Sequence, residues 1–137
     1  MKMRAFVNRI TCDRWNGVLC ENDEIDMPSI DDLNRAVEAL NSATRTLVFL
    51  NGQNGSHLAI GGGAGRYVVY VSTSDEDFWN LVADKNDSAG QVMLNAGGQE
   101  GDYPVRQVVD KLHALQAAHK FFKTGELDPS LKWEKQS

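Results

Sequence analysis

The sequence predicts an α+β fold in a single domain spanning residues 1–137. In it, an antiparallel β-sheet of about five or six strands packs against an N-terminal helix and a long C-terminal helix. Two observations predict this class. Short strand-like runs separated by glycine-rich turns fill the middle of the chain, which favours an antiparallel meander, and two capped amphipathic segments flank them. The length of 137 residues suits one domain, which can bury roughly two thirds of its unfolded surface without help from a metal or disulfide.

The N-terminal part is predicted to begin with one strand and two loops. Residues 4–11 have the composition of a strand. A loop should follow and include Trp15, because the adjoining Asn16-Gly17 pair is a turn signal. The acidic stretch at residues 21–26 is predicted to lie in a second loop.

A helix is predicted to begin after Pro28. Ser29 can cap it, and Asp32, three residues later, completes a variant of the capping box. The apolar residues that follow have the spacing of one helical face, which should pack on the sheet; they are Ile30, Leu33, Val37 and Leu40.

Three strands are predicted in the middle of the chain, at residues 44–50, 57–60 and 66–72. Short turns rich in glycine separate them, so the three should form a meander. Both faces of the segment 67–71 are largely apolar. This pattern is typical of a central strand that is covered on both sides, or covered on one side with a partner surface on the other.

The region after the meander is predicted to hold a short helix at residues 75–83 and two further strands, at 91–95 and 105–108. Between these two strands lies a glycine-rich acidic turn, AGGQEGDYP at residues 96–104.

Asp110 is predicted to cap the longest helix, which should end near Gly125 in a left-handed conformation. Its buried stripe is predicted to comprise Leu112, Leu115, Ala118 and Phe122, helped by Phe121. The tail that follows should fold back so that Leu131 and Trp133 pack on the core.

Charge and cysteine content limit the partners and the compartment. The formal net charge is −5 and the pI is about 5.1, which argues against direct binding to nucleic acid or an anionic membrane. Arg9 and Asp13 interrupt any signal-peptide core, so we expect a cytoplasmic location. Cys12 and Cys20 are expected to be free thiols in a reducing compartment, with a bridge between them as the alternative.

No catalytic, cofactor or metal motif is complete. The glycine run at 61–65 is followed by β-branched and aromatic residues, so it presents no helix N-terminus to a phosphate and is better interpreted as a hairpin turn. The histidines His57, His113 and His119 lack neighbours at metal-ligand spacing. We therefore expect a protein that is not an enzyme and carries neither cofactor nor metal.

Two acidic clusters remain as candidates for contact with a basic partner, the alternative being that both are solvated loops. In each, an aromatic side chain could anchor the contact. The candidate binding residues are Trp15, Glu21, Asp23, Glu24, Asp26, Gln99, Glu100, Asp102 and Tyr103.

Three segments, in this order, resemble the Imm1 family of bacterial immunity proteins. They are GGGAGRYVVYV at residues 61–71, GGQEGDYP at 97–104 and FFKTGELDPSLKW at 121–133. The resemblance covers residues 47–133 and is weak before them. It implies an α+β fold with an antiparallel sheet, and a cognate toxin domain as partner, bound as a 1:1 heterodimer. Proteins of this kind are often paired with nucleic-acid deaminase toxins, so a zinc-dependent deaminase is the toxin class expected.

The function predicted is therefore that of an immunity protein that binds its toxin and blocks the active site. The alternative is a binding module of another kind, such as a regulator or chaperone for a secreted protein. A small enzyme or ligand-binding protein that uses the glycine loops is a third hypothesis.

Overall fold

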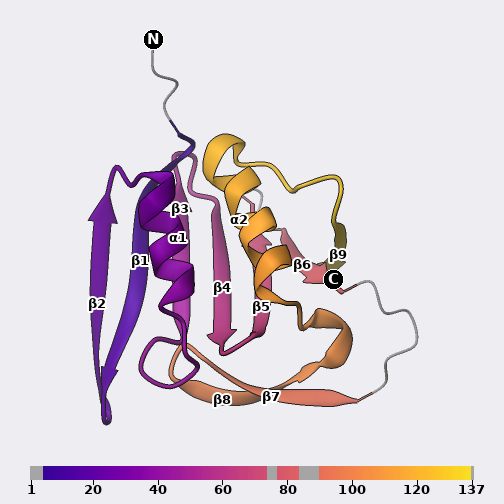
Figure 1. The fold of residues 1–137 in the computed structure, drawn as a ribbon. Helices are drawn as coiled ribbons and strands as arrows, with labels where there is room; N and C mark the ends of the chain where they lie inside the picture. Colours follow the sequence, from indigo (N-terminus) through magenta and orange to yellow (C-terminus); the bar gives the residue numbers. More distant parts are fainter. Residues whose placement is uncertain (1–4, 74–76, 84–89, 137) are drawn as a thin grey trace.

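The structure is a computed structural model that describes residues 5–73, 77–83 and 90–136. It confirms the predicted α+β class: a seven-stranded antiparallel sheet, a separate two-stranded hairpin and two helices (Figure 1). In chain order the elements are β1 (Val7–Asn16), β2 (Leu19–Asp26), α1 (Ile30–Glu38), β3 (Leu47–Gly52), β4 (His57–Gly63), β5 (Arg66–Ser72), β6 (Phe78–Val82), β7 (Gln91–Ala96), β8 (Gln99–Pro104), a 3₁₀ turn (Val105–Gln107), α2 (Lys111–Thr124) and β9 (Lys132–Gln136).

The strands of the large sheet lie in the order β2-β1-β3-β4-β5-β6-β9. The meander β3-β4-β5 is confirmed, and β5 has the predicted bounds. The first strand is longer than expected, because it continues through Trp15 to Asn16 and turns back at Gly17 into β2. The sequence predicted about five or six strands, and the described chain contains nine.

Two predictions after the meander are wrong. Residues 78–82 form strand β6, between β5 and β9, where a helix was predicted over 75–83; positions 74–76 lie outside the described residues. The predicted strand at 105–108 is a 3₁₀ turn, and the strand that pairs with β7 is β8, which comes just before it. Gly101 and Asp102 have low strand propensity, so only the pairing with β7 identifies β8 as a strand.

Both helices cover the same face of the large sheet, as Figure 1 shows. Helix α1 begins with the predicted capping box, in which the Ser29 hydroxyl accepts from the Asp32 amide at 3.1 Å and the Asp32 carboxylate accepts from the Ser29 amide at 2.9 Å. Helix α2 begins at the Asp110 cap and ends at Gly125, whose φ of 76° is left-handed, as predicted.

The apolar stripe of α2 is confirmed at Ala118, Phe121 and Phe122 but differs from the prediction at the two leucines. Leu112 is 71% exposed, and Leu115 is only partly buried. The residues that pack on the sheet are small ones followed by two rings: Ala114, Ala117, Ala118, Phe121 and Phe122. Small alanines therefore make the contact along most of the buried face, whereas Leu115 lies at its edge and Leu112 faces solvent.

Two further predictions are confirmed. The glycine run at 61–65 forms the β4–β5 hairpin, with Gly63 opposite Arg66 and a two-residue turn between them. The tail folds back as β9, where Trp133 is partly buried against the core and its Nε1 donates to the Asp128 carbonyl at 3.0 Å.

The Asp110 cap of α2 is expected to make a modest contribution to stability. Asp110→Ala should lower the free energy of unfolding by about 1 kcal/mol, because the carboxylate accepts from the His113 amide at 2.9 Å. Hydrogen bonds from the His113 amide and ring lower the pKa of the Asp110 carboxyl. The contribution is therefore present above about pH 4 and is lost as the pH falls through the folded-state pKa.

Urea denaturation at several pH values would measure this effect. Asp110→Asn is the matched control, because an asparagine caps as well but does not titrate. An unchanged stability of Asp110→Ala at neutral pH would contradict the role of the cap.

Candidate partner-binding surface

The first acidic cluster lies on β2, the outermost strand next to β1, and not in a loop as predicted. The tight turn after Asn16 places β2 antiparallel to β1 over its whole length, from Asn16 opposite Leu19 to Arg9 opposite Asp26. Alternate side chains of β2 therefore face opposite sides of the sheet.

Glu21 and Asp23 face the helix-covered side, where two arginines neutralise them. Arg14 pairs with Glu21 at 2.7 Å and with Asp23 at 3.3 Å, and Arg45 pairs with Asp23 at 2.8 Å. Desolvation raises the pKa of the Asp23 carboxyl, but hydrogen bonds and charge from both arginines outweigh it, so the net shift is downward. These two carboxylates therefore have little free charge to offer a partner.

Glu24 and Asp26 face the opposite side, which we call the open face because the described residues place neither helix on it. Arg9 lies between them, 2.7 Å from Asp26 and 3.7 Å from Glu24. One arginine thus serves two exposed carboxylates, and a net negative charge remains at this end of the open face.

The second acidic cluster lies on β8. Gln99, Glu100 and Asp102 are exposed, and within the described ranges neither carboxylate has an ion-pair partner. Here too the predicted loop is a strand. Its carboxylates, unlike Glu21 and Asp23 of β2, have no compensating ion pair among the described residues.

Trp15 connects the two clusters. Its ring lies against the turn of the β7–β8 hairpin, so closely that a Cβ on Gly98 would come within 1.9 Å of it. Its Nε1 donates to Asp13 at 2.7 Å, and the hydroxyl of buried Thr46 both donates to Asp13 and accepts from the Gly98 amide at 3.0 Å. Trp15 is thus partly buried and fixes the hairpin on the sheet.

Asp13 is a buried residue of this surface that was not predicted from the sequence; its side chain is 6% exposed. Besides Trp15 and the Thr46 hydroxyl, it accepts from the Thr46 amide at 2.7 Å and the Leu47 amide at 3.0 Å. No local signal marked it, because Asp13 stands among other polar residues of β1 such as Arg9 and Arg14. A buried carboxylate needs several donors, and two of those that serve Asp13 are amides of residues more than thirty positions away in sequence.

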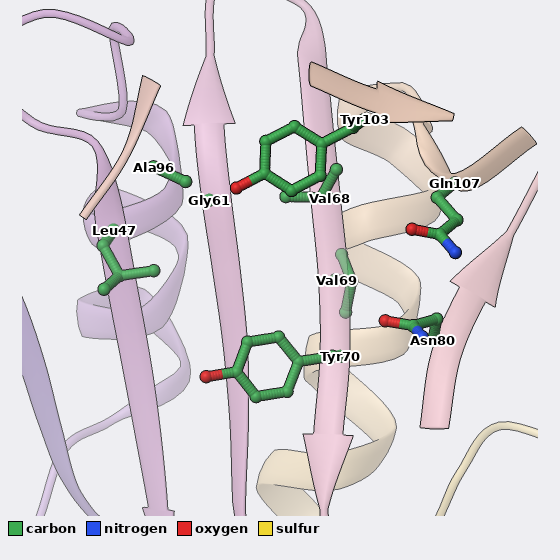
Figure 2. A pocket seen from close by; sticks show the side chains of 9 residues that line it. All are labelled: Leu47, Gly61, Val68, Val69, Tyr70, Asn80, Ala96, Tyr103 and Gln107. Carbon is green, nitrogen blue, oxygen red and sulfur yellow. The ribbon is translucent and has the colours of Figure 1, made fainter. Parts of the chain in front are cut away.

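Tyr103 comes from β8 and points toward the sheet. Figure 2 shows it on the same side of the sheet as Tyr70, with α2 behind. The two rings line a cavity of about 90 Å³ together with Leu47, Gly61, Val68, Val69, Asn80, Ala96 and Gln107. Pockets for small molecules have volumes of about 300–1,000 Å³, so this cavity suits a single side chain.

A row of four rings crosses the open face on β3, β4, β5 and β6; we call it the aromatic row. Phe49 lies 5.3 Å from His57, His57 lies 5.8 Å from Tyr70, and Tyr70 lies 5.8 Å from Phe78, measured between ring centroids. The first two contacts are edge-to-face. Only Tyr70 belonged to a segment for which the sequence predicted two apolar faces.

The model of a family described as Immunity protein Imm1 matches residues 21–135. The chain belongs to the Imm1 family. The match begins at Glu21, well before residue 47 where the resemblance in the sequence began, and it includes most of β2 and all of β8. A search of curated proteins found no match.

Membership of an immunity protein family implies a toxin as partner and a role in neutralising it. Immunity proteins are typically non-catalytic, in agreement with the sequence-based expectation. Neither helix in the described chain of this Imm1 protein is long and apolar enough to cross a membrane.

The histidines of this Imm1 protein have structural partners. The His113 ring contacts the Asp110 cap, and His119 Nε2 lies 2.7 Å from the side-chain oxygen Oδ1 of Asn34. His57 is in the aromatic row, where burial lowers its pKa. The described residues contain no group of three or more His, Cys, Asp or Glu that could hold a metal ion.

Both cysteines of the Imm1 protein are free, as predicted. Cys12 is buried opposite Asp23, whereas Cys20 is exposed opposite Trp15. Burial raises the pKa of the Cys12 thiol to about 11, against an opposing effect of Arg45. Cys12 therefore remains a protonated core residue at neutral pH.

Proposed function

We propose that this Imm1 protein binds a cognate toxin domain as a 1:1 complex and blocks access to the toxin's active site. Family membership supports a toxin as the partner. We expect the complex to form in the cytosol, before the toxin can act on the cell that makes it.

The toxin class that we propose is a nucleic-acid deaminase. This choice rests on the frequent pairing of Imm1-like proteins with such toxins. A zinc deaminase has to admit a flipped or single-stranded base to its pocket, so a protein over the entrance is enough to stop it. Because its substrate is a polyanion, its approach surface must be basic.

The exposed carboxylates of β8 are the observation that best supports contact with such a surface. Glu100 and Asp102 have no ion-pair partner among the described residues, whereas Glu21 and Asp23 are neutralised on the helix-covered side. Of the nine candidate residues, those of β8 therefore form the preferred electrostatic contact. Glu24 and Asp26 flank the open face and can extend this electrostatic contact. Trp15 lies against the turn of the β7–β8 hairpin and supports it on the sheet.

Affinity capture of the tagged protein from its native cytosol, with mass spectrometry of the bound proteins, tests the proposed function. We expect a larger protein that carries a toxin domain with the histidine-glutamate and paired-cysteine zinc signature of deaminases. Co-expression of this Imm1 protein with that toxin domain should restore the growth of cells that the toxin domain alone inhibits. Capture of a partner whose activity is unaffected by binding would favour the regulator or chaperone alternative.

Charge reversal on β8 is expected to slow association with the captured toxin domain. Glu100→Lys/Asp102→Lys should reduce the association rate constant by about tenfold or more at low salt, with a smaller effect at high salt. Stopped-flow or surface-based kinetics at several ionic strengths would measure it.

The matched control is Asp31→Lys/Glu126→Lys, which changes the net charge equally at exposed positions of α1 and of the segment after α2. If both double variants slow association equally, then the net charge of the protein determines the association rate and β8 is not the contact. Unchanged kinetics of the β8 variant would remove the electrostatic role but leave toxin binding intact.

A further inference from the structure

One of the two faces of the large sheet carries no helix in the described part of the chain. Strand alternation places Val48, Leu50, Ile60 and Val69 in the core beneath α1 and α2. The residues between them face the other way, and within the described residues the β7–β8 hairpin covers that open face only near one end, where Ala96 lies on Gly61.

The centre of the open face is more apolar than the solvent-exposed face of an ordinary antiparallel sheet. An antiparallel sheet with one solvated face normally carries polar residues there. Here the aromatic row occupies four adjacent strands, and Phe78 at its end is 42% exposed. Ala59, which lies opposite both Phe49 and Tyr70, is fully buried between larger neighbours. The row therefore forms a continuous surface without a gap at the small residue.

An aromatic centre with a polar rim is the anatomy of a protein interface. Tyrosine is among the residues that most often dominate binding energy, in pockets near the centre of the contact. The cavity beside Tyr70 and Tyr103 has room for one anchoring side chain from a partner. Asn80 lines this cavity and donates to Gln136 at 3.4 Å, so polar groups begin at the edge of the row.

The charges around the open face indicate the chemistry of the occupant. Glu24 and Asp26 flank it at β2, with one arginine between them, and Glu100 and Asp102 lie on the hairpin at its end. A second copy of this chain would bring like charges together. A partner rich in arginine and lysine would instead place cations against carboxylates and against aromatic faces, both of which are favourable.

We propose that the basic surface of the toxin domain docks on the open face, with the aromatic row at the centre of the contact and β8 at its rim. This inference rests on the proposed function and specifies its binding surface. Tight inhibition needs an interface of about 1,600 Å², which β8 alone is too small to provide. The open face and β8 together form one continuous surface.

The experiment uses the full chain and, as probe, the captured toxin domain in a catalytically inactive form. Tyr70→Ser/Phe78→Ser should weaken binding at least about 30-fold, as expected for residues at the centre of an interface. Leu112→Ser is the matched control, because Leu112 is an exposed apolar residue on the helix-covered side. Its affinity should stay within about twofold of the unmodified protein.

Hydroxyl-radical footprinting of the unmodified protein keeps the test independent of variant folding. Tyr70 and Phe78 should be protected in the complex, whereas Leu112 should not. Protection confined to the exposed pair Val18 and Leu19 at the tip of the β1–β2 hairpin would overturn the proposed surface.

The remaining outcomes separate this inference from the proposed function. If the toxin domain binds tightly and Tyr70→Ser/Phe78→Ser leaves its affinity unchanged, the docking surface is wrong but the proposed function stands. A dimer of this chain that Phe78→Ser dissociates would assign the open face to self-association and overturn it as well. If no toxin domain binds the full chain, the proposed function and this inference fail together.

Discussion

Gly63→Ala is expected to destabilise the protein by roughly 3–5 kcal/mol, a large part of the total for a small domain. Gly63 has a φ of 135°, which residues with a Cβ rarely adopt. A Cβ there would lie 2.6 Å from the backbone of both Leu40 and Asn41, in the segment that leads from α1 to β3. The methyl group therefore has to displace backbone, and urea denaturation would measure the cost.

Gly65→Ala separates strain from steric overlap. Gly65 also has a positive φ, of 91°, but a Cβ there would meet no atom within 4 Å. Its cost should be only that of the backbone conformation, about 1–2 kcal/mol. Equal losses for the two variants would contradict the close approach between β4 and the segment after α1.

Asp13→Ala is expected to cost about 3–5 kcal/mol and to release the β7–β8 hairpin from the sheet. The substitution removes a buried acceptor from the Thr46 and Leu47 amides, the Thr46 hydroxyl and the Trp15 indole. Buried donors left without a partner account for the loss. Because the Thr46 hydroxyl also holds the Gly98 amide, hydrogen exchange at Gly98 should accelerate.

Asp13→Asn is the informative comparison. The Asn carbonyl oxygen can still accept from the two amides, but its NH₂ group faces both the Trp15 indole and the Thr46 hydroxyl. The indole bond is therefore lost, and the hydroxyl has to accept where it donated before. We expect about 1–3 kcal/mol and a shifted Trp15 indole resonance in the NMR spectrum. A stability of Asp13→Ala equal to that of the unmodified protein would show that the Asp13 hydrogen bonds contribute nothing net.

The parts of the fold that local chemistry determines could be predicted from the sequence. Ser29 with Asp32, Asp110 and Gly125 specify helix ends through interactions within a few residues. The hairpin around Gly65 likewise follows from residues that tolerate positive φ.

The strands that were missed depend on pairing at a distance. β6 is a strand because β5 and β9 flank it, and β9 is about fifty residues away in sequence. β2 and β8 are rich in acidic residues, which propensity alone assigns to loops. In each case the partner strand supplies the hydrogen bonds that the local sequence does not predict.

The candidate surface was predictable only in part. The two acidic clusters were found, but the difference between them depends on Arg9, Arg14 and Arg45, which come from β1 and from the segment before β3. The aromatic row joins four strands, so no single segment of sequence contains its pattern.

The charges of β2 have a consequence for the solution behaviour of the free protein. The outer edge of an edge strand has free backbone hydrogen-bonding groups, to which a strand of another molecule can pair. Charged side chains on the edge strand are a common protection against such polymerisation. Two β2 strands meeting side by side would bring their carboxylates together. Arg9, Arg14 and Arg45 pair with the four carboxylates of the strand, so each copy of β2 keeps a net negative charge that repels the other. The acidic residues of this strand therefore favour a chain that stays dispersed at high concentration, so that it remains available until its partner is made.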